Sequence, residues 1–251
     1  MLGLAGSTVG VLYLWVAFSF ALGSFAQALS GFGFALIAIP LSSLVIGTTE
    51  AVVVQTFAGA VLSIVMAWQY RADADPAVLR FVVPASFVGI VIGMAVANSV
   101  SDRTLRFGVG TAVIGAALAI ATGFRFRTSR TGAVNGAAGL VSGVLAATTG
   151  TNGPPLVIAM AAQDASPRSF RANLQTSFAA TNVVLVPLFI ASGKVHRQTL
   201  VLSAVALVPT VIGRVVGEQV FAKLNPNRFR RVVLAMLFLS GTVALVKAGL
   251  G

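Results

Sequence analysis

The chain contains no cysteine, one histidine and only six acidic residues among 251. The absence of cysteine excludes disulfides, thiolate metal sites and cysteine nucleophiles, and it leaves the redox compartment open. A hydrolase within a membrane needs a nucleophile beside a base, or a pair of buried aspartates. His196 lies between Lys194 and Arg197 in an expected loop, and no acidic residue falls at the middle of an apolar run. We therefore expect no enzyme, no cofactor and no metal site.

Charged residues of either sign are scarce, at 9% of the chain, whereas 57% is hydrophobic. This composition is typical of membrane proteins and lies outside the soluble range. Most of the charge-free runs match the roughly 20 residues that cross a hydrocarbon core. These runs are residues 1–49, 51–70, 81–101, 107–124, 131–163, 172–193, 198–213 and 232–246. The lipid bilayer is the expected medium.

The net charge of +11 comes from basic residues in the short connections between these runs. In a soluble domain it would suggest nucleic acid as a partner. In a membrane protein it is explained by the excess of Lys and Arg in cytoplasmic loops. We therefore expect no nucleic-acid partner.

Two of the charge-free runs have lengths that do not fit whole crossings, and each contains a copy of one motif. Residues 1–49 contain SGFGFALIAIP from Ser30, and residues 131–163 contain TGTNGPPLVIAM from Thr149. Both copies place Gly, Pro and small residues where a membrane helix usually has Leu. Backbone leaves helical geometry at membrane depth only where protein or a water-filled cavity pairs its polar groups. Each copy predicts a broken helix beside a cavity.

Loop charges distinguish two topologies. Eight simple crossings place eight basic residues on each side. If each motif region enters and returns to the same side, one side holds eleven: Arg71, Arg80, Arg125, Arg127, Arg130, Arg168, Arg171, Lys223, Arg228, Arg230 and Arg231. The other side then holds five: Arg103, Arg106, Lys194, Arg197 and Lys247. The second distribution is a usable cytoplasmic bias, so we favour it.

That topology gives an all-α, polytopic membrane helix bundle. Three full spans and one broken or re-entrant segment per half make an odd number of crossings, so the two halves form inverted repeats. We expect one transmembrane domain over residues 1–251, with repeats over about 7–124 and 131–249. Further pairs in the same order support a duplication: Gln55-Thr56 with Gln175-Thr176, Val83-Pro84 with Val208-Pro209, and Gly89 and Gly93 with Gly213 and Gly217.

These motifs, in two related halves that span essentially the whole chain, resemble the TauE/SafE sulfite exporter family. Each half of that family opens with a glycine-rich motif that ends in proline. The resemblance implies a transporter of sulfite, sulfonates such as sulfoacetate, or other small sulfur or carboxylate anions across bacterial cytoplasmic membranes. This chain departs from the usual glycine triplets at Phe34 and Asn152. It also has Pro154-Pro155 in the second motif, and Ala159 where the first has Pro40.

Physical chemistry independently favours an anion as the ligand. A helix that restarts after a break presents unpaired N–H groups and the positive end of its dipole. Broken helices that meet at a repeat interface form a recurring type of transporter site. The expected substrate-binding residues from the motifs are Gly31, Phe32, Gly33, Phe34, Thr149, Gly150, Thr151, Asn152 and Gly153. The alternative is that these glycines only permit close helix packing.

Four further candidates lie in the helices that follow the two motifs, two in each helix. Gln55 and Gln175 each have an amide that can donate to a ligand oxygen, or instead bond a neighbouring helix. Thr56 and Thr176 are weaker candidates, because threonine hydroxyls often bond back to their own helix.

Arg214 is the one charge well inside an expected span. It is expected either to line the cytoplasmic entrance or to pair with Glu218 four residues later and snorkel.

Together with the family resemblance, the sequence predicts a multi-pass protein of the bacterial inner membrane that transports a small oxyanion by alternating access. Export is the expected direction, with import left open. The expected substrate is sulfite or a short, sulfoacetate-like organosulfonate, bound between the two motifs. A passive channel or a permease for thiosulfate or a small carboxylate is the alternative, because the same dipoles also serve a conducting pore. Repeat symmetry favours the carrier.

Overall fold

The computed structural model describes residues 2–96, 131–161, 163 and 166–225, with isolated positions between 107 and 118 and between 227 and 249. Apart from those positions, the third expected span of each half and the connector at 125–130 lie outside the described residues. The described elements are α1 (Leu2–Ser30), α2 (Phe34–Ser42), α3 (Thr48–Gln69), the 3-10 turn η1 (Arg71–Asp73), α4 (Pro76–Val96), α6 (Thr131–Thr148), α7 (Gly153–Ala161), α8 (Pro167–Ala191) and α9 (Arg197–Phe221).

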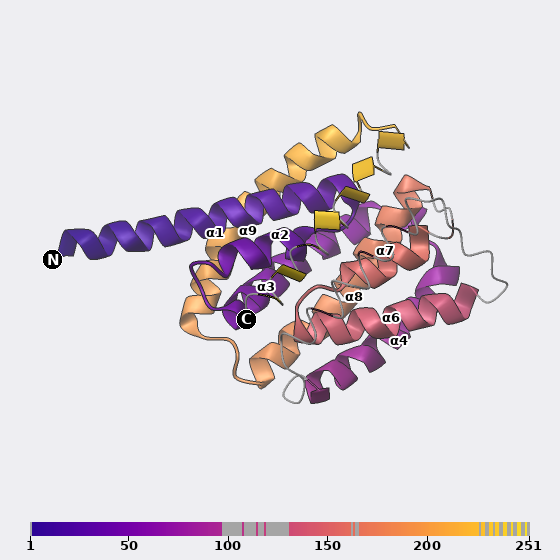
Figure 1. Cartoon of the computed structure of the whole chain (residues 1–251), viewed down its shortest axis with the longest axis horizontal. Coiled ribbons are helices and arrows are strands. Elements are labelled where there is room, and N and C mark those ends of the chain that lie inside the picture. Colours follow the sequence, from indigo (N-terminus) through magenta and orange to yellow (C-terminus); the bar gives the residue numbers. More distant parts are fainter. Residues whose placement is uncertain are drawn as a thin grey trace.

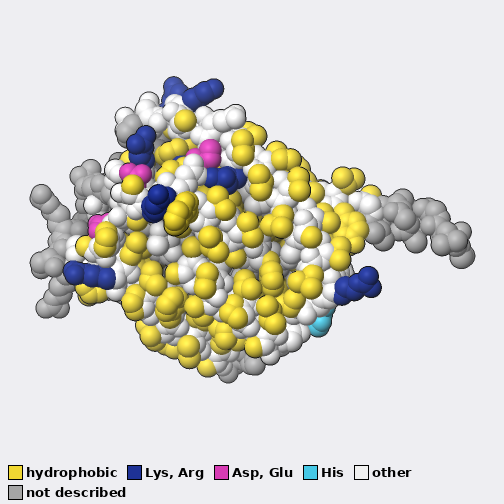
Figure 2. Space-filling model, turned by 180° about the vertical axis from the view of Figure 1, so that it is seen from behind, with side chains coloured by type: hydrophobic (Ala, Val, Ile, Leu, Met, Phe, Trp, Pro, Cys, Tyr) yellow, Lys and Arg dark blue, Asp and Glu magenta, His cyan; other side chains and the backbone are white. Residues whose placement is uncertain are grey.

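The described residues are helical and contain no strand, and six of their helices are long and apolar enough to cross a membrane: α1, α3, α4, α6, α8 and α9. On the face shown in Figure 2, hydrophobic side chains cover much of the surface between the ends where basic side chains gather. An exposed apolar belt of this kind suits lipid rather than water. The expected all-α, polytopic membrane fold is confirmed.

The first motif is a hairpin. Residues 31–33 interrupt the helix, and α2 then runs back along α1. Near the turn, a Cβ on Gly23 would lie 2.8 Å from the Phe34 ring, so the helices touch there. Farther from the turn, Trp15 Nε1 donates to the Leu41 carbonyl (2.7 Å). The chain therefore enters and returns, as the length of its charge-free run predicts.

The second motif forms the corresponding hairpin from α6 and α7. Beside the turn, Ser142 Oγ donates to the Asn152 carbonyl (2.7 Å). At the far end, Gln163 Nε2 donates to Asn135 Oδ1 (2.7 Å), so the returning chain finishes beside the start of α6. Both breaks in the helical pattern are thus reversals of direction.

Helix α1 of the first hairpin lies beside α9, and α6 of the second hairpin lies beside α4 (Figure 1). Matching glycines form both contacts. A Cβ on Gly213 of α9 would lie 2.1 Å from the Ala21 carbonyl oxygen of α1. A Cβ on Gly89 of α4 would lie 2.1 Å from the Leu140 carbonyl oxygen of α6. Ala21 and Leu140 each stand ten residues before the turn glycine of their hairpin, Gly31 or Gly150. Equivalent residues of the two halves therefore make equivalent contacts.

The two hairpins enter from opposite ends of the bundle. We call the end with Arg71, Arg80, Arg168 and Lys223 the basic end, and the end with Lys194 and Arg197 the opposite end. Gly213 and Gly217 of α9 contact Ala21 and then Phe25 of α1, so these two helices run in the same direction. Helices α4 and α6 are also parallel, because their glycine contacts advance along both helices in the same way. Since α9 ends and α4 begins at the basic end, α1 starts at the opposite end and α6 at the basic end. Among the described residues, this agrees with the hairpin topology and not with eight simple crossings.

Backbone contact at the glycines predicts opposite effects of two Gly→Ala changes in α6. A Cβ at Gly143 would lie 2.0 Å from the Ser86 carbonyl oxygen, whereas nothing lies within 4 Å of one at Gly136. We expect Gly143→Ala to lower the free energy of unfolding by about 1–3 kcal/mol through overpacking. Gly136→Ala should leave it unchanged or raise it by up to about 1 kcal/mol, because alanine favours the helix. Thermal unfolding in detergent measures both, and equal effects would contradict the packing described.

The hairpin topology predicts which sites share a face of the membrane. The chain has no cysteine, so single cysteines can be introduced at Thr131, Ser166 and Ser192, all of which are exposed. Thr131→Cys and Ser166→Cys should react with an impermeant maleimide from one face, and Ser192→Cys from the other. Labelling of the first two from opposite faces would show that α6 and α7 cross the membrane together.

Candidate functional site

Both hairpins turn at a glycine with left-handed backbone. Gly31 has φ 88° and Gly150 has φ 71°, values that L side chains rarely adopt. The preceding hydroxyl braces each turn: Ser30 Oγ lies 2.6 Å from the Phe32 carbonyl, and Thr149 Oγ1 lies 2.6 Å from Thr151 Oγ1. The two copies of the motif therefore share a turn conformation as well as a similar sequence.

The hairpin tips touch each other inside the bundle. A Cβ on Gly153 would lie 3.3 Å from the Phe32 Cβ, which is fully buried. A Cβ on Gly150 would lie 2.8 Å from Ile39 Cδ1 in α2 and 3.1 Å from Val52 in α3. Each tip therefore packs on helices of the other half, and glycine leaves room for that approach.

A cleft lies between the tips and the helices that follow them. It contains about 480 Å³ of space unoccupied by protein atoms, including its opening to solvent. No charged side chain lines it among the described residues, so its polar groups are neutral. The lining residues are Gln27, Gly33, Phe34, Ala35, Leu36, Gln55, Thr56, Gly59, Ala146, Gly150, Thr151, Asn152, Gly153, Phe178, Asn182 and Leu185.

The cleft brings together eight of the thirteen substrate-binding residues expected from the sequence: Gly33, Phe34, Gln55, Thr56, Gly150, Thr151, Asn152 and Gly153. The other five, Gly31, Phe32, Thr149, Gln175 and Thr176, do not line it. It also contains residues that sequence reasoning missed, chiefly Gln27 and Asn182. Asn182 follows Gln175 by seven residues, so helical periodicity places both on one face of α8.

Gln55 lines the cleft and is not engaged by the described residues around it. Its side chain is 8% exposed, and its amide has no hydrogen bond to the described residues. Its neighbours are engaged: Asn152 Nδ2 donates to Thr181 Oγ1 (3.2 Å) and Thr56 Oγ1 bonds back to the Val52 carbonyl (2.8 Å). Because Gln55 lines the cleft, an amide without a protein partner there is available to hydrogen-bond a ligand or water.

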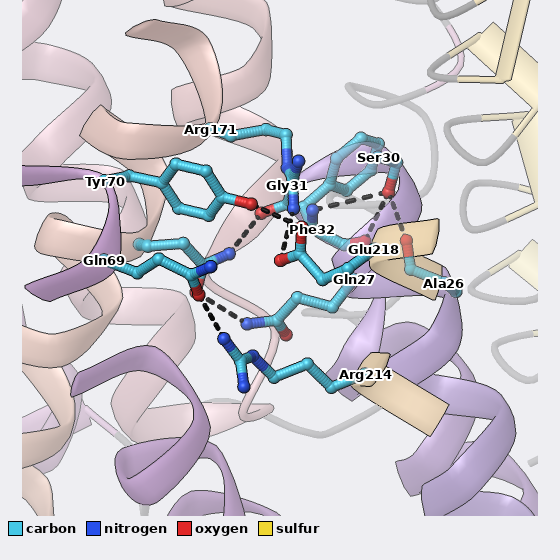
Figure 3. A network of polar contacts seen from close by, with 11 residues as sticks. Ala26, Gln27, Ser30, Gly31, Phe32, Gln69, Tyr70, Arg171, Arg214 and Glu218 are labelled. Carbon is cyan, nitrogen blue, oxygen red and sulfur yellow. Dashed lines mark hydrogen bonds and ion pairs between the residues drawn. The ribbon is translucent and has the colours of Figure 1, made fainter. Parts of the chain in front are cut away.

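Gln175, by contrast, is used within the protein. Its Nε2 donates to the Gly31 carbonyl and its Oε1 accepts from Gln27 Nε2, both at 2.9 Å. Figure 3 shows Gln27 and Gly31 in this polar network beside the first tip. Gln175 thus stabilises the first tip and does not line the cleft. Gln55, its counterpart in the sequence of the other half, does line the cleft.

The two returning helices present unequal N-termini to the cleft. In α2, the N–H groups of residues 34–36 precede the first intrahelical bond, from Ile37 N–H to the Gly33 carbonyl (3.1 Å). In α7, residues 154 and 155 are prolines and have no N–H. The first turn of α7 therefore loses two of its donors, and the nearby Thr151 and Asn152 side chains supply polar groups instead.

Arg214 does not form the expected pair with Glu218. Its Nη2 donates to Gln69 Oε1 of α3, while Glu218 Oε1 accepts from Arg171 Nη2 at 2.9 Å. The i,i+4 interpretation was wrong because Arg171 and Gln69 from other helices reach these groups. Arg214 does not line the cleft.

Arg171 is a buried cation that sequence reasoning placed among the loop arginines. Its side chain is 0% exposed and lies in the second turn of α8, with its guanidinium over the rings of Phe221 (3.7 Å) and Tyr70 (4.7 Å). One signal was available: Arg171 stands four residues before Gln175, on the same helix face. Its Nε and Nη1 have no hydrogen-bond partner among the described residues.

Tyr70, just beyond α3, completes this cluster. Its hydroxyl donates to Glu218 Oε2, so both oxygens of that carboxylate are engaged. Burial raises the pKa of Tyr70 to about 12, and the hydrogen bond to Glu218 acts in the same direction. The phenol is therefore protonated, and a donor, at neutral pH. Among the described residues, no group of three or more His, Asp or Glu side chains is placed to hold a metal ion.

A polytopic helix bundle with a neutral polar cleft between two oppositely entering hairpins defines a membrane transporter in architecture. A family model described as "Sulfite exporter TauE/SafE" matches residues 15–244, nearly the whole chain. The chain therefore belongs to the TauE/SafE sulfite exporter family, whose members are membrane transporters of small anions. No curated protein and no solved structure matches it.

Proposed function

We propose that this protein is a carrier that exports a small oxyanion, sulfite or a short organosulfonate such as sulfoacetate, and binds it in the cleft between the hairpin tips. The main supporting observation is that the Gln55 amide, which has no hydrogen bond to the described residues, lines a cleft that also receives the N-terminus of α2. The proposed location is the bacterial inner membrane, and the proposed activity is transport without catalysis.

Neutral donors suit a carrier of anions. Free N–H groups at the start of α2, with the positive end of its dipole, replace part of the hydration of an oxyanion. A full cation in a dry cleft would hold an anion more strongly and slow its release. Because the described lining of the cleft has amides and hydroxyls and no charged side chain, it selects by hydrogen-bond geometry while letting the anion leave.

The residues divide into ligands and supports. Gln55, Asn152 and Thr151 are the proposed side-chain ligands, together with the backbone at Gly33 and Gly153. Thr149 braces Thr151, and Gln27 and Gln175 position the Gly31 turn. Thr176 lies beside Gln175 but outside the cleft, so we assign it no contact with the anion.

Alternating access is the proposed mechanism. The hairpins enter from opposite ends and make equivalent glycine contacts with α4 and α9, so each half has the same packing with reversed direction. Such pseudo-symmetry lets a bundle exchange two conformations of similar energy about one site. A passive channel through the same dipoles remains the second candidate.

The proposed ligand role of Gln55 predicts weaker anion binding in Gln55→Leu. Losing a hydrogen bond to a charged ligand should weaken affinity by at least about tenfold. Calorimetric titration of purified protein with sulfite, sulfoacetate, thiosulfate and small dicarboxylates would measure the effect and rank the substrates. Gln219→Leu, at an exposed position of α9, is the matched control and should bind as the wild type does.

If Gln55→Leu binds the anion with wild-type affinity, the cleft is not the binding site. Asn152→Ala should weaken binding less, because its amide is already shared with Thr181. Combining the two changes should weaken binding further than either alone, since both residues line one cleft.

Carrier and channel differ in the flux expected from reconstituted vesicles. A carrier should show saturable efflux of the bound anion and counterflow of labelled anion, at rates set by conformational exchange. Ohmic currents orders of magnitude above carrier turnover would instead establish the channel.

A further inference from the structure

The Arg171 cluster lies between the first hairpin tip and the basic end of the bundle. A Cβ on Gly31 would lie 2.9 Å from Arg171 Cγ, so the arginine stem packs on the turn itself. On its other side, Glu218 is near the end of α9 and Tyr70 follows α3. Figure 3 shows the guanidinium beside Gly31, with Tyr70 and Glu218 around it. Gln175 bonds the Gly31 carbonyl and Gln27, and Gln27 lines the cleft.

Arg171 is only partly paired for a fully buried cation. Of its five N–H donors, one on Nη2 bonds Glu218, and those on Nε and Nη1 have no partner in the part of the chain that the structure describes. Since Nη2 belongs to both two-donor edges of a guanidinium, a donor remains free on each edge. A buried ion pair retained for stability is expected to have its remaining donors satisfied.

Glu218 is the accessible member of the pair. Its side chain is 21% exposed, against 0% for Arg171. An anion that arrives from, or leaves toward, the basic end therefore meets the carboxylate before the guanidinium. The carboxylate is itself an oxyanion, held by one arginine N–H and the Tyr70 hydroxyl. Sulfonate and sulfite present three oxygens and fit a two-donor guanidinium edge.

We propose that Arg171 is a second binding station for the transported oxyanion, at the basic end of the pathway, and that Glu218 occupies it when no anion is there. The anion displaces the carboxylate and takes Nη2 together with Nε or Nη1. Release of Glu218 then opens the basic end, and its return closes that end behind the anion. This inference rests on the proposed function, since it concerns the route of the same anion to and from the cleft.

The decisive variant is Glu218→Gln, which keeps the shape and the Tyr70 contact but removes the competing charge. Removing an internal competitor raises the fraction of binding-competent protein, so sulfoacetate affinity should tighten by about tenfold. The gain should vanish in Arg171→Gln/Glu218→Gln, which leaves no unpaired buried charge. That double variant should retain Gln55-dependent binding in the cleft and lose vesicle efflux.

Arg168→Gln is the matched control, because it removes the same charge three residues away at an exposed position of α8. It should bind and transport as the wild type does. Wild-type affinity in Glu218→Gln would overturn the proposal. If that variant does not fold, the double variant decides, and wild-type efflux from it would overturn the proposal equally.

These outcomes separate the second station from the cleft. If the wild type binds sulfoacetate and Gln55→Leu weakens that binding, the proposed function stands whatever Glu218→Gln does. If the wild type binds no oxyanion of the panel, the proposed function fails first. The gain in sulfoacetate affinity from Glu218→Gln belongs to Arg171 itself if it persists when Gln55→Leu is added and disappears when Arg171 is replaced.

Discussion

The structure depends on one constraint: backbone that leaves a helix at membrane depth must have its polar groups paired or sheltered. Both motifs break a helix, and the bundle shelters each break with the other. Phe32 of the first tip packs on Gly153 of the second, while Gly150 packs on the helices of the first half. The glycines of α4 and α9 then bring backbone against backbone, which closes the bundle around the tips. Without these close approaches the turns would have no protein around them.

The same constraint accounts for the chemistry of the cleft. Donors freed by the break at Gly33 have no intrahelical partners, so they are available to an anion. The polar side chains around them are neutral, and charge is kept beyond the Gly31 turn, at Arg171 and Glu218. In the proposed route, an anion passes from a charged station to a neutral one, where it is solvated without being trapped.

Symmetry of the scaffold is combined with asymmetry of the chemistry. Equivalent glycines make equivalent contacts, yet Gln55 has no hydrogen bond to the described residues, while its counterpart Gln175 bonds the Gly31 carbonyl. The start of α2 keeps its N–H donors, while prolines at 154 and 155 remove two from α7. Helix packing requires small residues at matching places in both halves, whereas a single small ligand needs only one set of donors. The chemistry of the two halves can therefore differ while the packing glycines match.

The sequence by itself determined the membrane environment, the two breaks, their turn glycines and the opposite entry of the hairpins. Hydropathy, segment length and loop charge are properties of short stretches and of their order, and these were enough. Only the tertiary structure decided that Gln55 has no partner in the described part of the chain, that Gln175 supports a turn, and that Glu218 pairs with Arg171 instead of Arg214. A hydrogen-bond partner depends on how each helix is rotated and how far it lies from its neighbours. Periodicity shows which face of a helix is buried, as it does for Arg171, but it does not show what that face meets.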